Sequence, residues 1–263
     1  MRTNHDIDYK IYGEELQFVE IELDPEETAI AESGSFLMMD NGIEMQTIFG
    51  DGSRPSTGIL GKLVSAGKRL LTGESLFMTA FTNIAHAGKL RVSFAAPYTG
   101  KIIPLDLSQY NGKIIAQKDA FLCAAKGVSV GIELQRRLGT GIFGGEGFIM
   151  QKLEGDGLCF VHAGGYVIEK ELRPGEVLKV DTGCVVAYTS GIDFDIEFIR
   201  GIKNFMFGGE GLFFARLTGP GKVWIQSLPI SRLAGKMMQY GSGSRREEGS
   251  ILGGLGDMFD GRE

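Results

Sequence analysis

The chain has 263 residues, of which 43% are apolar, so it is long enough to bury a sizeable core. Its formal net charge is −6, from 27 basic and 33 acidic residues, which argues against the overall attraction to nucleic acid that a basic protein has. Glycine is the compositional outlier, with 40 residues against 7 prolines, and without a Gly-X-Y period it indicates tight turns between short strands.

Residues 1–10 lack the apolar stretch of a signal peptide and carry Asp6 and Asp8, so neither a signal peptide nor a transit peptide is predicted. No apolar run reaches the roughly 18 residues that a membrane-spanning helix needs. Cys123, Cys159 and Cys184 lie in apolar runs without C-x-x-C spacing, which predicts buried, reduced thiols. These features predict a cytoplasmic protein.

The first of three predicted structural units spans residues 8–93. Its turn at Glu22–Glu27, with the pattern Glu-Leu-x-Pro-x-Glu, recurs at Glu171–Glu176, an offset of 149 residues. This unit is longer than the other two, which places an insertion within about residues 46–71.

The insertion has the pattern of a short basic amphipathic helix. Its apolar residues lie at helical spacing with basic residues between them: Ile59, Leu60, Leu63, Val64, Leu70 and Leu71. We expect this helix to cover a sheet, and a helix that docks on a membrane surface or a partner is the alternative.

The second and third units, residues 94–163 and 164–229, align without a gap at an offset of 64 residues. In both, apolar and polar residues alternate with period two, as in Ile192, Phe194 and Ile196, which is typical of half-buried strands. Units of this size that do not close alone are expected to pack together. We therefore predict an all-β fold, with three diverged β-sandwich-like repeats around a pseudo-threefold axis.

The C-terminal tail, residues 230–263, lies outside the three units. It begins with a predicted helix over residues 231–240. Glycine, serine and alternating charge over residues 241–250 predict disorder, so the tail is expected to be partly disordered.

Three short sequence patterns resemble known binding sites, but each lacks the spacing or the neighbouring elements that its site requires. Gly139–Gly144 spells G-x-G-x-x-G, but a predicted strand follows it where a dinucleotide site needs a helix. Gly61–Lys68 resembles a P-loop with the wrong spacing and no following Ser or Thr. His5, His86 and His162 show no zinc-ligand spacing, and His162 reads as a polar strand residue. We therefore predict no catalytic, cofactor-binding or metal-binding residues and no cofactor.

A glutamate follows glycine at the same place in each unit, at Glu74, Glu146 and Glu210. If the units pack around an axis, these carboxylates could converge on a cation or share protons. The simpler interpretation, which we favour, is a structural one: a turn that leads into a strand.

The loops before these glutamates contain bulky apolar residues beside glycines and basic residues. This candidate apolar rim consists of Leu70, Leu71, Ile142, Phe143, Phe205 and Phe207. Core packing is the interpretation we favour. If the three loops lie at one end of the molecule, they would form a membrane or partner surface.

Several motifs occur in an order that resembles a known family: Phe49-Gly50-Asp51-Gly52, Leu71-Thr72-Gly73-Glu74, Ala95-Ala96-Pro97-Tyr98, Phe143-Gly144-Gly145-Glu146-Gly147 and Phe207-Gly208-Gly209-Glu210-Gly211. The chain resembles, over about residues 9–235, the uncharacterised bacterial and archaeal family related to altered inheritance of mitochondria protein 24. The resemblance implies a β-sandwich similar to the tryptophan RNA-binding attenuation protein, used in triplicate. It implies no catalytic residues, and it offers only a loose analogy to membrane or scaffold roles.

The function predicted from the sequence is that of a non-enzymatic scaffold or binding protein that acts through a protein or a membrane surface. A small-ligand or cation-binding protein, or an enzyme that uses a cleft between repeats, is the alternative. Nucleic-acid binding ranks last, because it rests on fold analogy alone. A free sheet edge or the tail would allow a homo-oligomer.

Overall fold

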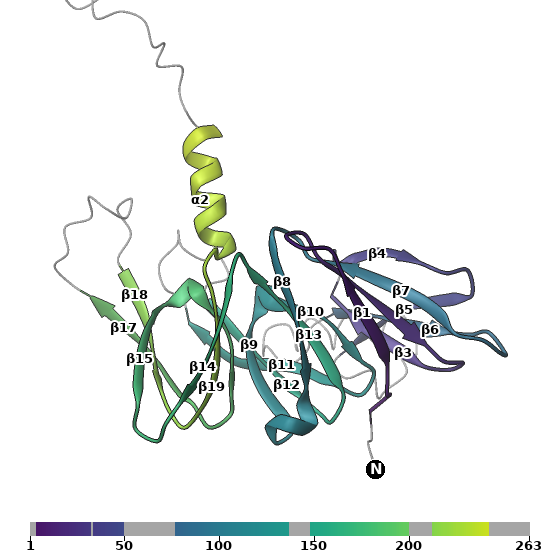
Figure 1. Ribbon diagram of the computed structural model, residues 1–263, viewed down its shortest axis with the longest axis horizontal. Helices are drawn as coiled ribbons and strands as arrows, with labels where there is room; N and C mark the ends of the chain where they lie inside the picture. Colours follow the sequence, from purple (N-terminus) through teal and green to yellow (C-terminus); the bar gives the residue numbers. More distant parts are fainter. Residues whose placement is uncertain (1–3, 33, 50–76, 137–147, 200–211, 242–263) are drawn as a thin grey trace, which may run out of the picture.

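The computed structural model describes residues 4–32, 34–49, 77–136, 148–199 and 212–241. Over these residues the protein is all-β, with one α-helix near the C-terminal end (Figure 1). The first strands are β1 (Asp8–Tyr12), β2 (Phe18–Leu23), β3 (Thr28–Ala31), β4 (Phe36–Met39), β5 (Ile43–Phe49), β6 (Phe77–Asn83) and β7 (Leu90–Ala95). They are followed by β8 (Gly100–Asp106), β9 (Lys113–Gln117), β10 (Phe121–Ala125), β11 (Ser129–Arg136), β12 (Phe148–Glu154) and β13 (Leu158–Gly164). The last are β14 (Val167–Leu172), β15 (Val177–Asp181), β16 (Val185–Thr189), β17 (Asp193–Ile199), β18 (Leu212–Thr218), β19 (Gly221–Gln226) and helix α2 (Ile230–Gly241). Single 3-10 turns are η1 (Leu107–Tyr110), η2 (Lys118–Ala120) and η4 (Thr182–Cys184).

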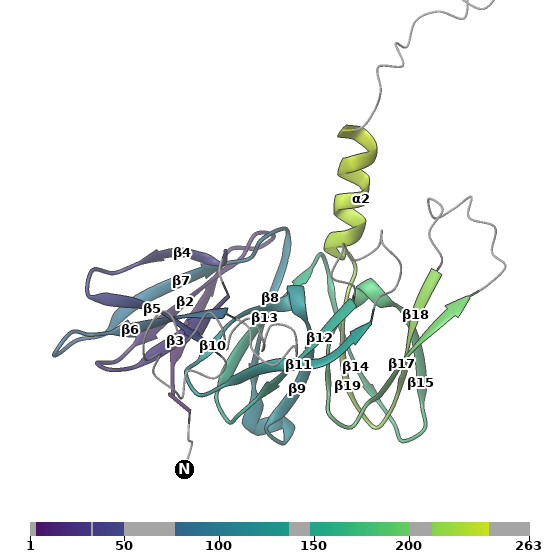
Figure 2. The same ribbon diagram turned by 180° about the vertical axis from the view of Figure 1, so that it is seen from behind.

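The described strands form four antiparallel sheets, which we call A to D. Sheet A has the order β1-β2-β7-β4, and sheet B has the order β5-β6-β3-β10-β13-β8. Sheet C has the order β11-β12-β9-β16-β19-β14, and sheet D has the order β15-β18-β17. Sheets A and D lie at opposite ends of the molecule in both views (Figures 1 and 2).

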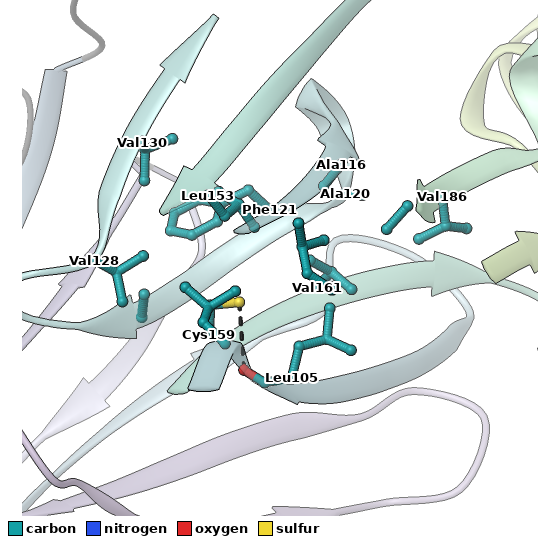
Figure 3. Close-up of a cluster of buried hydrophobic side chains, with 14 of the residues drawn as sticks. Leu105, Ala116, Ala120, Phe121, Val128, Val130, Leu153, Cys159, Val161 and Val186 are labelled. Carbon is teal, nitrogen blue, oxygen red and sulfur yellow. Dashed lines mark hydrogen bonds between the residues drawn. The ribbon is translucent and has the colours of Figure 1, made fainter. Parts of the chain in front are cut away.

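Three buried apolar clusters hold the sheets together. One joins sheets A and B, through residues such as Ile21 and Phe160. The second joins sheets B and C, and Figure 3 shows Leu105, Val161 and Leu153 within it. The third joins sheets C and D. The sheets therefore stack in the order A, B, C, D, with sheets B and C buried on both faces.

The position of a strand in this stack explains its sequence pattern. Strand β2 belongs to an outer sheet, and its residues alternate between half-buried and buried. Strands β3 and β10 lie in the middle of sheet B and are buried at every residue. An uninterrupted apolar run is typical of a strand with both faces covered. The small side chains of Ala29 and Ala31 pack in the cluster between sheets A and B, and that of Ala124 packs in the cluster between sheets B and C.

The strand order recurs along the chain. The order β5-β6-β3 in sheet B is matched by β11-β12-β9 in sheet C and by β17-β18-β15 in sheet D. The order β4-β7-β2 in sheet A is matched by β10-β13-β8 and by β16-β19-β14. Two pairings join these sets: β3 with β10, and β9 with β16.

The all-β class, the strands that follow the three Gly-Glu pairs and the helix after residue 230 are confirmed. The interpretation of the units as copies around a pseudo-threefold axis stays a prediction. The expected insertion helix, at residues 59–71, lies outside the described residues.

The turn that recurs at Glu22–Glu27 and Glu171–Glu176 has the same local structure in both copies. The Glu27 carboxylate accepts a hydrogen bond from the Asp24 backbone N–H at 2.8 Å, and Glu176 accepts one from Arg173 at 2.9 Å. Before each glutamate the backbone has a positive φ, 71° at Glu26 and 78° at Gly175. No atom lies within 4 Å of a Cβ built on Gly175, so only its backbone conformation opposes a side chain.

We expect Gly175→Ala to lower the free energy of unfolding by about 1 kcal/mol, because an L-residue is strained at this φ. Urea unfolding would measure the change. The reciprocal change Glu26→Gly should not destabilise the protein, because it removes the same strain. An unchanged stability in Gly175→Ala would contradict this account of the turn.

Candidate functional site

The site residues predicted from sequence lie outside the described residues. This applies to the three glutamates, Glu74, Glu146 and Glu210, and to the whole apolar rim: Leu70, Leu71, Ile142, Phe143, Phe205 and Phe207. The strands that follow the glutamates, β6, β12 and β18, belong to sheets B, C and D. The structural interpretation of the three glutamates therefore stays a prediction, and the convergence of their carboxylates stays the alternative hypothesis.

His162 is the most strongly perturbed histidine among the described residues. It lies in β13 with 1% of its surface exposed, and its ring contacts that of Tyr98 edge-on at 4.5 Å. Burial lowers the pKa of His162 to about 4, although an interaction with the Tyr98 backbone opposes this shift. The imidazole is therefore neutral at physiological pH. The sequence predicted a polar strand residue, and its position in a strand is confirmed, whereas its burial was not predicted.

A polar contact joins the first and second predicted units. Gln151, in β12, is fully buried and donates a hydrogen bond to the Glu32 carboxylate at 3.1 Å. Burial raises the pKa of Glu32, and the hydrogen bond from Gln151 only partly offsets this. The contact ties two sheets together.

The three cysteines are buried, free thiols, as the sequence predicted. Cys159 directs its Sγ toward the Leu105 carbonyl oxygen at 3.5 Å (Figure 3). Burial raises the pKa of all three thiols. Because the thiolate is the reactive form, these cysteines are poor nucleophiles and poor metal ligands as they stand.

The described residues show neither a metal-binding cluster nor a spanning helix. Within residues 4–32, 34–49, 77–136, 148–199 and 212–241, no three His, Cys, Asp or Glu side chains come together in a metal-binding arrangement. None of the helices placed there is long and apolar enough to cross a bilayer.

The most distinctive surface feature is strand β4, at one edge of sheet A. All four residues of this strand are exposed and apolar: Phe36 at 42%, Leu37 at 47%, Met38 at 48% and Met39 at 38%. On one side β4 pairs with β7, and on its other side it has no hydrogen-bonded strand among the described residues. We call these four residues the β4 edge.

The β4 edge differs from every other sheet edge in the described part of the chain. The other edge strands are β1, β5, β8, β11, β14, β15 and β17. Each of those strands contains a charged residue or a proline, as proteins usually arrange at a free edge. The β4 edge contains neither, so its backbone and side chains suit the addition of another strand.

The surface beside the β4 edge is charged, but its charges are paired. Arg91, in β7, lies 3.0 Å from the Glu22 carboxylate and 3.6 Å from that of Glu20. Lys89 lies 2.7 Å from Asp8 and 3.1 Å from Glu22. These pairs leave no uncompensated basic patch on the strands next to β4.

The family described as Mitochondrial biogenesis AIM24 matches residues 9–228 of the chain, which span strands β1 to β19 almost entirely. The chain belongs to the AIM24 family. The resemblance inferred from the ordered Gly-Glu motifs is thereby confirmed.

Two streptococcal proteins are similar to this AIM24-family chain. An uncharacterised protein of Streptococcus pyogenes serotype M6 is 30% identical over 226 residues, which cover 84% of this chain and 86% of the relative. The crystal structure of a second Streptococcus pyogenes protein has a TM-score of 0.70 at 24% identity, and the match covers 89% of this chain and 99% of that one. At this identity the structural match shows a shared fold and carries no function.

The β4 edge of this AIM24-family protein was not predicted from sequence motifs, although its residues form a recognisable pattern. Phe36–Met39 is a run of four apolar residues between Ser35 and Asp40. By pattern alone, such a run predicts a strand covered on both faces. Only the strand pairing shows that, among the described residues, β7 lies on one side of it and no strand lies on the other.

Proposed function

We propose that this AIM24-family protein is a non-enzymatic scaffold that binds a protein partner along the β4 edge. The observation that carries the proposal is the exposure of four consecutive apolar residues on an edge strand that has no protecting charge or proline. An extended segment of a partner would pair with the free backbone groups of β4 and bury its side chains.

A protein partner fits this surface better than a membrane. Binding to anionic lipid needs uncompensated Lys and Arg residues near an apolar surface. Beside the β4 edge, Lys89 and Arg91 are already paired with Asp8, Glu20 and Glu22. The residues that suggested a membrane surface from sequence, in the insertion and the apolar rim, lie outside the described residues.

We also propose that the scaffold consists of three diverged β-sandwich units, over residues 8–93, 94–163 and 164–229, like those of the tryptophan RNA-binding attenuation protein. The recurring strand order supports this division. The three free thiols support a reducing location such as the cytoplasm.

A photo-crosslinking experiment tests the proposed function. The full chain would carry p-benzoylphenylalanine in place of Leu37, in the β4 edge, and would be irradiated in its native cells. We expect a discrete crosslinked product whose second component mass spectrometry identifies as a protein. The matched control places the same group at Ile84, which is 56% exposed and lies just after β6.

The product should be absent from the Ile84 control and should weaken when Met39→Lys is added to the Leu37 variant. Equal products from both positions, or none from position 37, would count against a binding role for the β4 edge.

A further inference from the structure

We infer that the partner of the β4 edge is strand β15 of a second copy of this chain, so that copies join head to tail. The inference rests on the proposed function, because it names the occupant of the same edge. Strand β15 is one of the two edge strands of sheet D, at the other end of the stack from β4. Figures 1 and 2 place the two strands too far apart to pair within one molecule as the chain is folded.

The chain contains two internal examples of this junction. Strand β3 pairs with β10, and strand β9 pairs with β16, both antiparallel. The first junction aligns Ala31 with Cys123, Ile30 with Ala124 and Ala29 with Ala125. The second aligns Ala116 with Ala187, Ile115 with Tyr188 and Ile114 with Thr189. Both strands of the second junction therefore follow those of the first by a constant offset, which is 85 residues for β3 to β9 and 64 residues for β10 to β16.

A shared irregularity places β4 in the same role as β10 and β16. The register with the neighbouring strand shifts between Phe36 and Met38 in β4, between Phe121 and Cys123 in β10, and between Val185 and Ala187 in β16. A bulge at the same point of three strands aligns them residue by residue. Met38 therefore corresponds to Cys123, and Met39 corresponds to Ala124.

Strand β15 is equivalent in position to β3 and β9. The order β15-β18-β17 in sheet D matches the order β9-β12-β11 in sheet C. The offset of 64 residues that relates β10 to β16 also carries Ala116 onto Val180 and Ile115 onto Lys179. In sheet D, however, no strand pairs with the outer side of β15 within the described residues.

The internal junctions thus predict the register between two copies. Met38 of one copy would lie opposite Val180 of the other, Met39 opposite Lys179, and Asp40 opposite Leu178. The joined sheet would have the order β17-β18-β15 followed by β4-β7-β2-β1, which extends the pattern of sheets B and C.

Exposure at the two free edges is consistent with this junction. In the internal junctions, Ala31, Cys123 and Ala116 are completely buried. At the corresponding positions of the free edges, Met38 is 48% exposed, whereas Val180 is only 9% exposed because it packs in the cluster between sheets C and D. Val177, at the start of β15, is 44% exposed. Joining the edges would bury apolar surface that one copy alone leaves in water.

The junction between copies should be weaker than the internal ones. On the outer face of sheet D, Lys179 forms an ion pair with Glu197, which also lies 3.7 Å from Arg216. At the position of Lys179, the internal junctions have Ile30 and Ile115. We therefore expect a reversible association that depends on concentration. Because the two edges differ, the contact is heterologous and adds copies in one direction.

Sedimentation velocity of the purified full chain over a wide range of concentration tests the inference. We expect the wild-type protein to form species larger than a monomer. Met39→Lys should weaken this association about tenfold, because it places a lysine directly opposite Lys179 and removes apolar burial. Adding Lys179→Glu to Met39→Lys should restore association, because opposite charges then face each other.

Met39 and Lys179 are both exposed, so the variants should fold, and circular dichroism would verify this. Ile84→Lys is the matched control, because it adds the same charge to an exposed apolar position outside both edges and should leave association unchanged.

A wild-type chain that stays monomeric throughout the range would overturn the inference. So would a loss of association in Met39→Lys that Lys179→Glu does not restore, because the two residues would then not face each other across the junction. If the chain is monomeric but position 37 crosslinks to a different protein, the proposed function survives and the head-to-tail junction does not.

Discussion

Replacing Phe160 with alanine is expected to lower the free energy of unfolding by about 4 kcal/mol. Phe160 is fully buried in β13, and its ring contacts that of Tyr9 edge-on at 4.9 Å. It belongs to the cluster between sheets A and B, although it is far along the chain from most of that cluster. Its removal would leave a cavity between two sheets whose backbones have little freedom to close it.

The matched control for this prediction is Phe36→Ala on the β4 edge. Phe36 is 42% exposed and stacks on Phe81 with ring centroids 5.6 Å apart. Because 42% of the residue is already exposed to water, we expect a loss of about 1 kcal/mol or less. Urea unfolding would compare the two variants with the wild type. Equal losses would contradict the assignment of Phe160 to a core between the sheets.

His162→Gln is expected to remove most of the acid sensitivity of folding between pH 6.5 and pH 4. Burial lowers the pKa of His162 from 6.5 to about 4 in the folded protein. Between these values the unfolded chain binds a proton that the folded protein excludes, so the free energy of unfolding falls as the pH falls. The shift corresponds to about 3 kcal/mol. Glutamine fits the site, because Gln226, at the corresponding position of β19, is buried with hydrogen bonds to Gly164 and Gly183.

The measurement is urea unfolding of wild type and variant at a series of pH values across this window. The difference between the two proteins is the useful quantity, because other groups titrate there as well. Burial also lowers the pKa of His5, which acts in the same direction, and raises that of Glu32, which acts in the opposite direction. His86→Gln, at an exposed turn, is the control. If wild type and His162→Gln lose stability in parallel, the buried imidazole is not the cause.

The positions of individual strands along the chain could be predicted from sequence, because secondary structure depends largely on the pattern of neighbouring residues. Alternation of Ile192, Phe194 and Ile196 with acidic residues predicted the strand that became β17. The apolar runs around Cys123, Cys159 and Cys184 predicted buried thiols, and the ordered Gly-Glu motifs indicated the family. Each of these inferences needs only the period of a strand, the preference of a side chain or a motif order.

The pairing of strands was beyond such reasoning. A short apolar run such as those of β3, β10 and β16 is typical of a buried strand but does not show which strand lies beside it, because backbone hydrogen bonds form between any two extended segments. The same limit applies to burial. His162 and its counterpart Gln226 both read as polar strand residues, and only the stacking of sheets on both faces shows that they lie out of reach of water.

The sequence by itself determined that this chain is a β-rich protein of the AIM24 family with reduced thiols. It also determined where several of the strands lie along the chain. The tertiary structure decided which apolar run remains exposed. Phe121–Ala125 and Phe36–Met39 are both short apolar strands. Among the strands that the structure describes, the first has a neighbour on each side, whereas the second has a neighbour on one side only. Exposure depends on what lies beside a strand in space, and a residue pattern within the strand holds no information about that neighbour.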